Sequence, residues 1–316
     1  MGESKLKRSR AEEMPTSCAG VQTAGGRVQV RWDADGAATP MGQLAYFIEF
    51  LTLTGLWRSW QDRCPLSYTS PNAPGKADVL GTWMLSILSG HRRYSHVTTI
   101  RCDGVNPGLL GMNKVISEDA LRRALLAIPE EAGVGWLDGH LRESTAPLLD
   151  VPWILDIDTT IKPLYGKQEG AVVSYNPKKP GRPSHSYHTY LMAGLRLVMG
   201  VEVKAGNEHS GRHTLPGLLK LLDELPAAHK PKMVRGDCGF GSDGIMRELE
   251  ARAQPYLFKL RLSKNVKRHI ERLFRVSGWT DAGQGWEGID STLALTGWEG
   301  TRRVVVLRRP LRGEML

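Results

Sequence analysis

The stretch WILDIDTT, residues 153–160, decides the fold, because an apolar strand here carries two carboxylates separated by one residue. Alternate residues of a strand share a face, so Asp156 and Asp158 are expected to point the same way. A carboxylate within an apolar strand is costly to bury unless a cation or a hydrogen-bond network compensates it. Mg²⁺ is one such partner, since it prefers carboxylate and water oxygens. The alternative is a turn-capping role with Thr159 and Thr160, which we favour for Asp156.

A second acidic residue follows a short apolar strand in MVRGDCGFGSDG, residues 233–244. Asp237 is expected at the carboxyl end of this strand, where α/β sheets place their ligands, and the following glycines permit close approach. The turn is neither a GxGxxG nor a Walker loop, so we exclude nucleotide binding here. Cys238 has no evident base, which argues against a cysteine nucleophile. Asp237 is therefore either a metal ligand or a turn-capping residue.

Outward from these two stretches, the sequence falls into three regions. Residues 1–40 are polar and predict a flexible tail with a possible strand at 27–32. Residues 41–150 carry apolar residues at helical spacing, with a helix expected to begin at Ser117 through a capping oxygen. Residues 151–316 alternate short apolar runs with turns, which is typical of a mixed α/β domain.

Within the α/β region, the pattern predicts strands and helices at specific places. The expected strands are 153–158, 171–174, 190–197, 199–204, 233–235, 256–259, 286–290, 292–295 and 303–307. The expected helices are 215–225, with Thr214 as a possible cap, and 244–253, with Ser242 or Asp243 as a possible cap.

The positive charge lies entirely in the second half of the chain. Residues 1–150 hold 16 basic and 16 acidic side chains, whereas residues 151–316 hold 26 and 17. Seven basic residues and one acidic residue lie between Lys259 and Arg275, a cluster that is either a phosphate contact surface or a solvated helix face. A second basic segment, NPKKPGRP, contains Lys178, Lys179 and Arg182, and we favour phosphate contact for it. Two strand-end aspartates in the same basic region together indicate two-metal phosphoryl chemistry on nucleic acid.

Composition excludes several other classes of protein. The four cysteines have no CxxC spacing, which indicates reduced thiols rather than a disulfide framework or a zinc knuckle. No apolar stretch is long enough for a membrane helix and no export signal is present, so we expect a cytoplasmic protein with no membrane partner.

The ordered motifs LDIDTTIKPLYGKQEGAVVSYNPKKPGRPSHSYH, GNEHS and VRGDCGF resemble the core of bacterial insertion-sequence DDE transposases. The upstream segment HRRYSHVTTIRCDGVNPGLLGMNKVISEDALRRAL resembles their N-terminal region, so the resemblance covers roughly residues 85–310. It implies an RNase H-like catalytic core with a β-rich insertion, preceded by a helical region for DNA-end recognition or dimerisation. It further implies Mg²⁺ or Mn²⁺ dependence and cleavage and transfer of double-stranded DNA at terminal repeats and target.

By position in these motifs, the resemblance makes Asp158 the first catalytic and metal-binding carboxylate and Asp237 the second, with Asp156 supporting them. It also implies self-association on DNA. Lys178, Lys179, Arg182, Lys264, Lys267 and Arg268 are the expected DNA contacts.

The family carries its third carboxylate, a glutamate, on a helix after the insertion, within a Tyr–Arg–Glu–Lys type signature. No glutamate up to Leu316 has that context, and Glu314 has no helix around it. We therefore expect a C-terminally truncated copy that is inactive alone. Its alternative role is a non-catalytic DNA-binding or inhibitory fragment.

Two further readings stay open. A metal-dependent nuclease would need a local third carboxylate, for which Glu169 and Glu202 are the candidates. Zinc binding would use the His185 and His188 pair or the His209 and His213 pair, but the surrounding residues do not favour a helix there. Asn207 and His209 either line the cleft or order their own loop.

Overall fold

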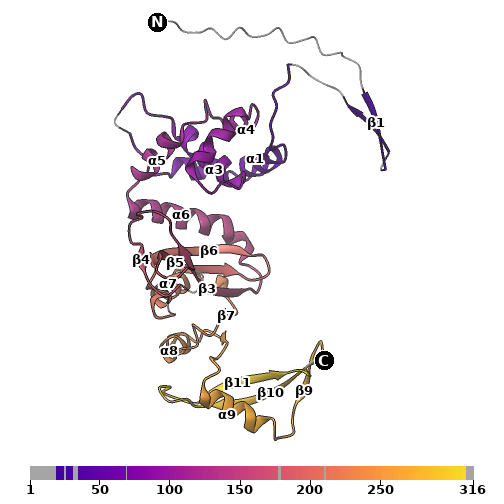
Figure 1. Cartoon of the computed structure of the whole chain (residues 1–316), viewed down its shortest axis with the longest axis vertical. Coiled ribbons are helices and arrows are strands. Elements are labelled where there is room, and N and C mark those ends of the chain that lie inside the picture. Colours follow the sequence, from indigo (N-terminus) through magenta and orange to yellow (C-terminus); the bar gives the residue numbers. More distant parts are fainter. Residues whose placement is uncertain are drawn as a thin grey trace. The chain divides into compact units, whose positions relative to one another are not determined.

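The computed structural model describes residues 19–24, 26–30, 35–68, 70–176, 179–209 and 211–310. The chain divides into two compact units, Met1–Trp136 and Leu137–Leu316 (Figure 1). The division falls inside helix α6 (Glu130–Thr145), upstream of the change in sequence pattern at Pro152.

The first unit contains a hairpin and a set of helices. Its elements are β1 (Ala19–Thr23), β2 (Gly26–Val30), α1 (Leu44–Leu53), α2 (Leu56–Asp62), α3 (Lys76–Leu88), η1 (Tyr94–Cys102), α4 (Asn106–Leu109) and α5 (Glu118–Leu126). Ser117 accepts a hydrogen bond from the Ala120 amide at 3.2 Å, which confirms the predicted helix start. The strand expected at 27–32 corresponds to β2 as far as Val30. Residues 1–18 and 31–34 lie outside the described residues.

The core of this unit contains a group of tryptophan rings, side chains that bury large apolar surfaces. Trp60 and Trp136 stack with ring centroids 5.1 Å apart, and the Trp136 indole N–H donates to the Trp60 carbonyl at 2.9 Å. The fully buried Val79, Leu80 and Leu85 of α3 pack in the same core.

The second unit contains the central sheet. Its elements are η2 (Ala146–Leu148), β3 (Ile154–Pro163), β4 (Val172–Val173), β5 (Pro183–Met192), β6 (Leu197–Ala205), α7 (Gly211–Glu224), η3 (Ala227–His229), β7 (Met233–Gly236), α8 (Asp243–Ala251) and β8 (Tyr256–Phe258). A further helix, α9 (Lys264–Leu273), precedes the strands β9 (Thr280–Gly283), β10 (Trp286–Leu293) and β11 (Arg302–Arg308).

The strand order identifies the fold. The strands lie in the order β6-β5-β3-β7-β8, and β4 pairs with the start of β5. β3, β5 and β6 form an antiparallel meander, whereas β7 and β8 run parallel to β3. α7 connects β6 to β7 and α8 connects β7 to β8, as parallel neighbours require. This is the RNase H-like arrangement, so the expected fold class is confirmed.

One face of the sheet is buried against α7. Leu155 and Ile157 of β3 pack in one apolar cluster with Leu218 and Leu222 of α7. Thr159 lies 3.4 Å from the Thr214 hydroxyl of that helix. Because side chains alternate along a strand, residues 156, 158 and 160 point to the opposite face.

The β-rich insertion is the three-stranded sheet β11-β10-β9 with α9, at the yellow end of the chain in Figure 1. The side chain of Arg302, only 10% exposed, joins this sheet to α8 through Asp243 at 2.7 Å and Glu250 at 2.7 Å. The hydrogen bond to Arg302 lowers the pKa of both carboxyl groups. A multi-point charged contact of this kind fixes the insertion more firmly than an isolated surface pair would.

Three predictions about elements are wrong in detail. The strand expected at 190–197 is interrupted after Met192 by a turn in which Gly194 and Arg196 have positive φ, so that β5 and β6 form a hairpin. The runs 286–290 and 292–295 form one strand, β10. α7 begins at Gly211, so Thr214 lies within the helix and its hydroxyl is 2.9 Å from His188 Nδ1.

His188 is fully buried under α7 and is held neutral by its surroundings. Its Nε2–H donates to the Glu208 carbonyl, which leaves Nδ1 to accept from the Thr214 hydroxyl. Burial lowers the pKa of His188; Lys204 and His213 lower it further, whereas the Glu208 carbonyl and Glu202 oppose the shift. Protonation therefore favours the unfolded chain.

The expected result is a loss of stability on acidification. The contribution of His188 is intact above the unfolded-state pKa of about 6.5 and is lost as the pH falls from there through the folded-state pKa, with a slope of at most about 1.4 kcal/mol per pH unit. Urea unfolding between pH 7.5 and 5.5 measures this slope. The His188→Gln variant should be less stable at pH 7.5 and show a smaller slope. An equal slope in both proteins would show that His188 does not couple to unfolding.

Candidate active site

Asp158 and Asp237 are brought together by the parallel pairing of β3 with β7. In that pairing Asp156 lies opposite Arg235 and Ile157 opposite Gly236, so one further step places Asp158 beside Asp237. Asp158 lies within β3 on the face opposite α7, whereas Asp237 is the first residue after β7.

The Asp158 carboxylate is exposed at the point where β3 passes beyond the end of β7. Its Oδ2 accepts a long hydrogen bond, 3.4 Å, from the Thr160 hydroxyl. Its backbone carbonyl accepts from the Thr189 hydroxyl of β5 at 3.3 Å. The strand is thus held in place while the carboxylate oxygens remain accessible.

Asp237 begins the turn after β7, and its Oδ1 accepts from the Gly239 amide at 2.8 Å. The turn is packed closely from below. A Cβ on Gly211, the first residue of α7, would lie 2.7 Å from the Gly239 carbonyl oxygen, and the following Phe240 is buried. Close backbone packing of this kind, which glycine alone permits, fixes where Asp237 points.

Asp156 does not share this accessibility. Its two oxygens accept from Nε and Nη2 of Arg235, both at 2.6 Å, in a bidentate ion pair across the two strands. This hydrogen bonding raises the pKa of Arg235. The turn-capping role considered for Asp156 is therefore wrong: its partner is Arg235 and not Thr159 or Thr160. Sequence reasoning missed Arg235, although its position two residues before Asp237 places it on the same face.

The Asp158 and Asp237 pair fits a hard divalent ion. Both residues offer exposed carboxylate oxygens, the ligands that Mg²⁺ prefers together with water and phosphate oxygens. Within the parts of the chain that the structure describes, no group of three or more His, Cys, Asp or Glu side chains is arranged to hold a metal. Two carboxylates with open positions are the arrangement in which substrate oxygens complete the coordination.

Glu202 cannot be the third carboxylate of a metal-dependent nuclease site with Asp158 and Asp237. This side chain lies on the α7 face, where its Oε2 accepts from the Tyr190 hydroxyl at 2.7 Å and its Oε1 lies 3.3 Å from Lys204. The sheet therefore separates it from Asp158. Glu169 belongs to the β3–β4 loop and its carbonyl lies 2.8 Å from His185 Nε2.

The histidines considered for zinc binding make hydrogen bonds within the protein. His185 and His188 lie three apart on a strand, so they point to opposite faces, and both ring nitrogens of His188 are occupied. His209 Nδ1 is 3.2 Å from the Gly206 carbonyl, and its ring lies 6.3 Å from that of Tyr175. His209 thus contributes to the order of its own loop.

The basic segment NPKKPGRP is partly described. Lys178 lies outside the described residues, whereas Lys179 and Arg182 are exposed in the loop before β5. The Arg182 guanidinium lies 4.6 Å from the centre of the Tyr165 ring. Stacking on an aromatic face keeps a guanidinium extended at the surface, where it can meet an anion.

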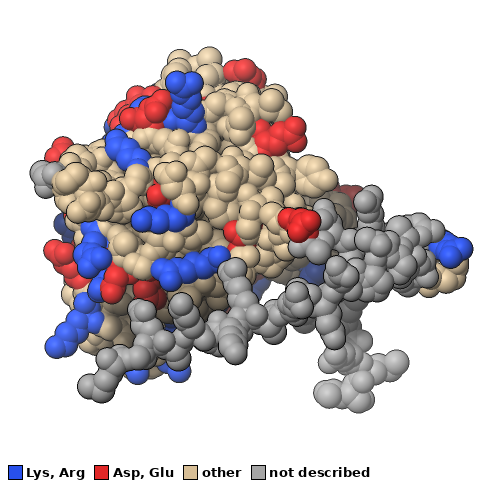
Figure 2. Space-filling view, turned by 90° about the horizontal axis from the view of Figure 1, so that it is seen from above, with Lys and Arg blue, Asp and Glu red and all other residues tan. Residues whose placement is uncertain are grey.

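The basic cluster between Lys259 and Arg275 contains helix α9. Val266 and His269 are buried on one side, whereas Lys264, Lys267 and Arg268 are exposed and, with Glu271, line a hollow of about 380 Å³. On the face of the molecule drawn in Figure 2, by contrast, basic and acidic side chains are interspersed with uncharged surface.

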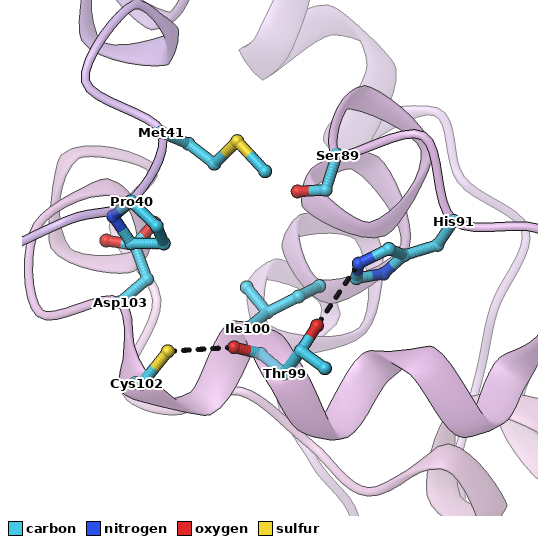
Figure 3. A pocket seen from close by; sticks show the side chains of 8 residues that line it. All are labelled: Pro40, Met41, Ser89, His91, Thr99, Ile100, Cys102 and Asp103. Atoms are coloured by element: carbon cyan, nitrogen blue, oxygen red, sulfur yellow. Dashed lines mark hydrogen bonds between the residues drawn. The ribbon is translucent and has the colours of Figure 1, made fainter.

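A hollow of about 290 Å³ lies in the helical unit (Figure 3). His91 lies at its edge, with Nε2 3.2 Å from the Thr99 hydroxyl and Nδ1 3.1 Å from Ser86. Burial lowers the pKa of His91, as does His96 beside it. The Cys102 thiol donates to the Thr99 carbonyl at 2.9 Å. These polar groups satisfy one another and serve to hold α3 against η1.

Among the described residues, no helix has both the length and the apolar character needed to cross a membrane. Residues 85–312 match the family model described as transposase DDE domain group 1. No curated protein matches the chain.

Solved structures similar to the chain include a piggyBac transposase synaptic complex with hairpin DNA, at 13% identity and a TM-score of 0.33. The match covers 88% of this chain and 54% of the piggyBac chain, so the chain spans about half the length of that protein. A Mos1 strand transfer complex matches at 12% identity and a TM-score of 0.25, over 66% of this chain and 68% of the other.

Proposed function

The chain belongs to the transposase DDE domain group 1 family, and from this we propose that it acts in DNA transposition at the ends of an insertion-sequence type element. In this proposal Asp158 and Asp237 hold Mg²⁺ or Mn²⁺ for DNA strand cleavage and transfer. The observation that supports the proposal is the cross-strand register of β3 and β7 in an RNase H-like sheet, because its last pair, Ile157 and Gly236, directly precedes the exposed Asp158 and Asp237.

In this proposal each part of the site has a separate role. Bound metal ions would activate the attacking oxygen and stabilise the leaving oxygen of a phosphodiester. Asp158 is held by β3 and Asp237 by the packed turn after β7, so both ligands are preorganised. Asp156 supports them through its ion pair with Arg235 on the same face.

DNA contact is assigned to the exposed cations of the second unit. Lys179 and Arg182, together with Lys178, would contact the backbone from the loop before β5, and Lys264, Lys267 and Arg268 from α9. Cationic side chains that neutralise phosphates gain from counterion release, which makes such binding steeply salt-dependent. The helical unit, with its balanced charge, is assigned to DNA-end recognition or dimerisation.

A second candidate function is a non-catalytic DNA-binding or inhibitory transposase fragment. We retain it because, among the described residues, no group of three or more His, Cys, Asp or Glu side chains is arranged to hold a metal. The two functions are separated by incubating the purified chain with double-stranded DNA in Mg²⁺, Mn²⁺ or EDTA and measuring binding and nicking together. Metal-dependent nicking supports the enzyme, whereas binding without nicking in any buffer supports the fragment.

For self-association, we propose that α1 is the contact surface between two copies. Its buried side holds Ile48 and Leu51, while the other side exposes Tyr46, Phe47, Phe50 and Leu53 (76%, 40%, 51% and 80% exposed). Glu49 is the single charged residue of the helix, so this surface does not suit DNA.

The area of this surface is enough for a weak dimer contact. Aromatic side chains bury about 150–250 Å² each when fully covered. The α1 surface thus offers on the order of 500 Å² per copy, near the lower limit for a specific dimer. Two copies held on one DNA would gain the missing stability from effective concentration.

The Leu53→Glu variant is expected to be monomeric under conditions where the unmodified chain forms dimers, because it would bury two like charges across the contact. Sedimentation of each protein, alone and with a DNA duplex, measures this. Leu126→Glu is the matched control, since Leu126 is 78% exposed at the end of α5. Dimers that persist in Leu53→Glu, or a chain that is monomeric with and without DNA, would exclude α1 as the contact.

A further inference from the structure

We infer that Arg235 is a phosphodiester-binding residue, held in position by Asp156 beside the Asp158 and Asp237 pair. The inference rests on the proposed function, because it places a DNA phosphate next to the proposed metal ligands. It assigns a binding role to a guanidinium that neither the sequence motifs nor the family match assigns.

The geometry of the ion pair leaves the outer edge of the guanidinium open. Arg235 uses Nε and one N–H of Nη2 for Asp156. A guanidinium has five N–H donors, so the two N–H groups of Nη1 and the second of Nη2 remain. Among the described residues, no other acceptor lies within hydrogen-bonding distance of Arg235, whose side chain is 48% exposed. Those three donors form a fork of the shape that binds phosphate in a bidentate manner.

The position of Arg235 relative to the carboxylates suits a neighbouring phosphate. Asp237 follows Arg235 by two residues, as Asp158 follows Asp156, so the carboxylate pair lies one row beyond the ion pair in the direction of β3. Successive rows on one face of a strand lie about 7 Å apart. A strand of DNA bound with one phosphate at the carboxylate pair would pass over the Arg235 row.

The net charge of the carboxylate row (Asp158 and Asp237) differs from that of the ion-pair row (Asp156 and Arg235), as binding of metal ions in one row and of a phosphate in the other requires. Within the described part of the chain, no ion pair neutralises the carboxylate row, which suits metal ions, whereas in the ion-pair row Asp156 and Arg235 neutralise each other. Asp156 fixes the planar fork at both Nε and Nη2, which lowers the entropy that Arg235 would lose on binding an anion. Asp156 is thus a positioning residue and Arg235 the binding residue.

The alternative is that the ion pair only stabilises the sheet. A matched control for this exists in Arg252, which pairs with Asp223 at 3.2 Å between α8 and α7, in the helical layer on the opposite face of the sheet. Arg252→Gln removes the same charge and a similar cross-element ion pair, yet lies away from the proposed path of the DNA.

The experiment measures binding of a fluorescent DNA duplex to the full chain in EDTA at several salt concentrations. Arg235→Gln is expected to bind about tenfold more weakly, because it loses a charge-assisted bidentate contact, and to lower the slope of log K against log salt by about 0.9. Arg252→Gln should keep both values. Arg235→Lys should retain the slope but not the full affinity, and Asp156→Asn should retain the slope with a smaller loss of affinity.

Equal binding and equal salt slopes for Arg235→Gln, Arg252→Gln and the unmodified chain would overturn the inference, as would a loss in Arg235→Gln that merely follows a loss of folded protein in circular dichroism. Because EDTA removes the metals, this outcome is separate from the proposed catalysis. A chain that nicks DNA yet is indifferent to Arg235→Gln would keep the proposed function and reject the phosphate contact. DNA binding that depends on Arg235, without metal-dependent nicking, would support the phosphate contact and reject the proposed catalysis.

Discussion

Asp158→Asn and Asp237→Asn are each expected to lower metal-dependent DNA nicking by about a thousandfold or more. A carboxylate ligand that becomes an amide loses its charge and the greater part of its attraction for Mg²⁺, and metal catalysis contributes several kcal/mol, with each 1.36 kcal/mol equal to a factor of ten in rate. The measurement is the initial rate of nicking in Mn²⁺, beside binding of Mn²⁺ followed by its electron paramagnetic resonance signal. Metal binding is informative even for a chain that does not nick.

Asp281→Asn is the matched control for these variants. Asp281 is an exposed aspartate whose Oδ1 accepts a hydrogen bond from the Gly283 amide at 2.9 Å. The Oδ1 of Asp237 accepts from the Gly239 amide in the same way. It lies in the β9–β10 hairpin of the insertion, outside the proposed site. If Asp281→Asn lowered nicking and Mn²⁺ binding as much as Asp237→Asn, or if Asp158→Asn and Asp237→Asn left both unchanged, the assignment of the metal centre would be wrong.

Gly211→Ala is expected to destabilise the second unit by about 2–3 kcal/mol, even though alanine is intrinsically the better helix former by up to about 1 kcal/mol. The added Cβ would lie 2.7 Å from both the Gly239 carbonyl oxygen and Ile245 Cδ1. A backbone carbonyl cannot rotate away as a flexible side chain can, so the turn that carries Asp237 must shift. Urea unfolding measures the first effect, and Mn²⁺ binding, which should weaken, measures the second.

Gly244→Ala is the matched control, because Gly244, like Gly211, lies in the first turn of a helix, yet the substitution is not expected to destabilise the protein. Gly244 lies in the first turn of α8 with open space around a built Cβ, so the substitution should be neutral or stabilise the fold by up to about 1 kcal/mol. Stabilisation by Gly211→Ala of the same sign and size would show that α7 does not pack against the Asp237 turn as described.

The sequence alone determined features whose causes are local. The apolar residues around Asp158 predict a strand, and that strand is β3; the run before Asp237 predicts β7; and the hydroxyl of Ser117 predicts the start of α5. Each depends on residues within a few positions of one another, through side-chain alternation, turn chemistry or capping. The order of the motifs also sufficed for the family and the fold class.

Other features follow from contacts between distant residues, and these only the tertiary structure decided. The partner of Asp156 is Arg235, 79 residues away, because the parallel register of β3 and β7 sets them opposite each other. The same alternation that joins Asp158 to Asp237 puts Glu202 on the far side of the sheet, although all are acidic residues on or beside strands. The hydrophobic pattern decides which face of each strand is buried, but two strands so far apart in the sequence share no turn that would fix which of their residues lie opposite each other.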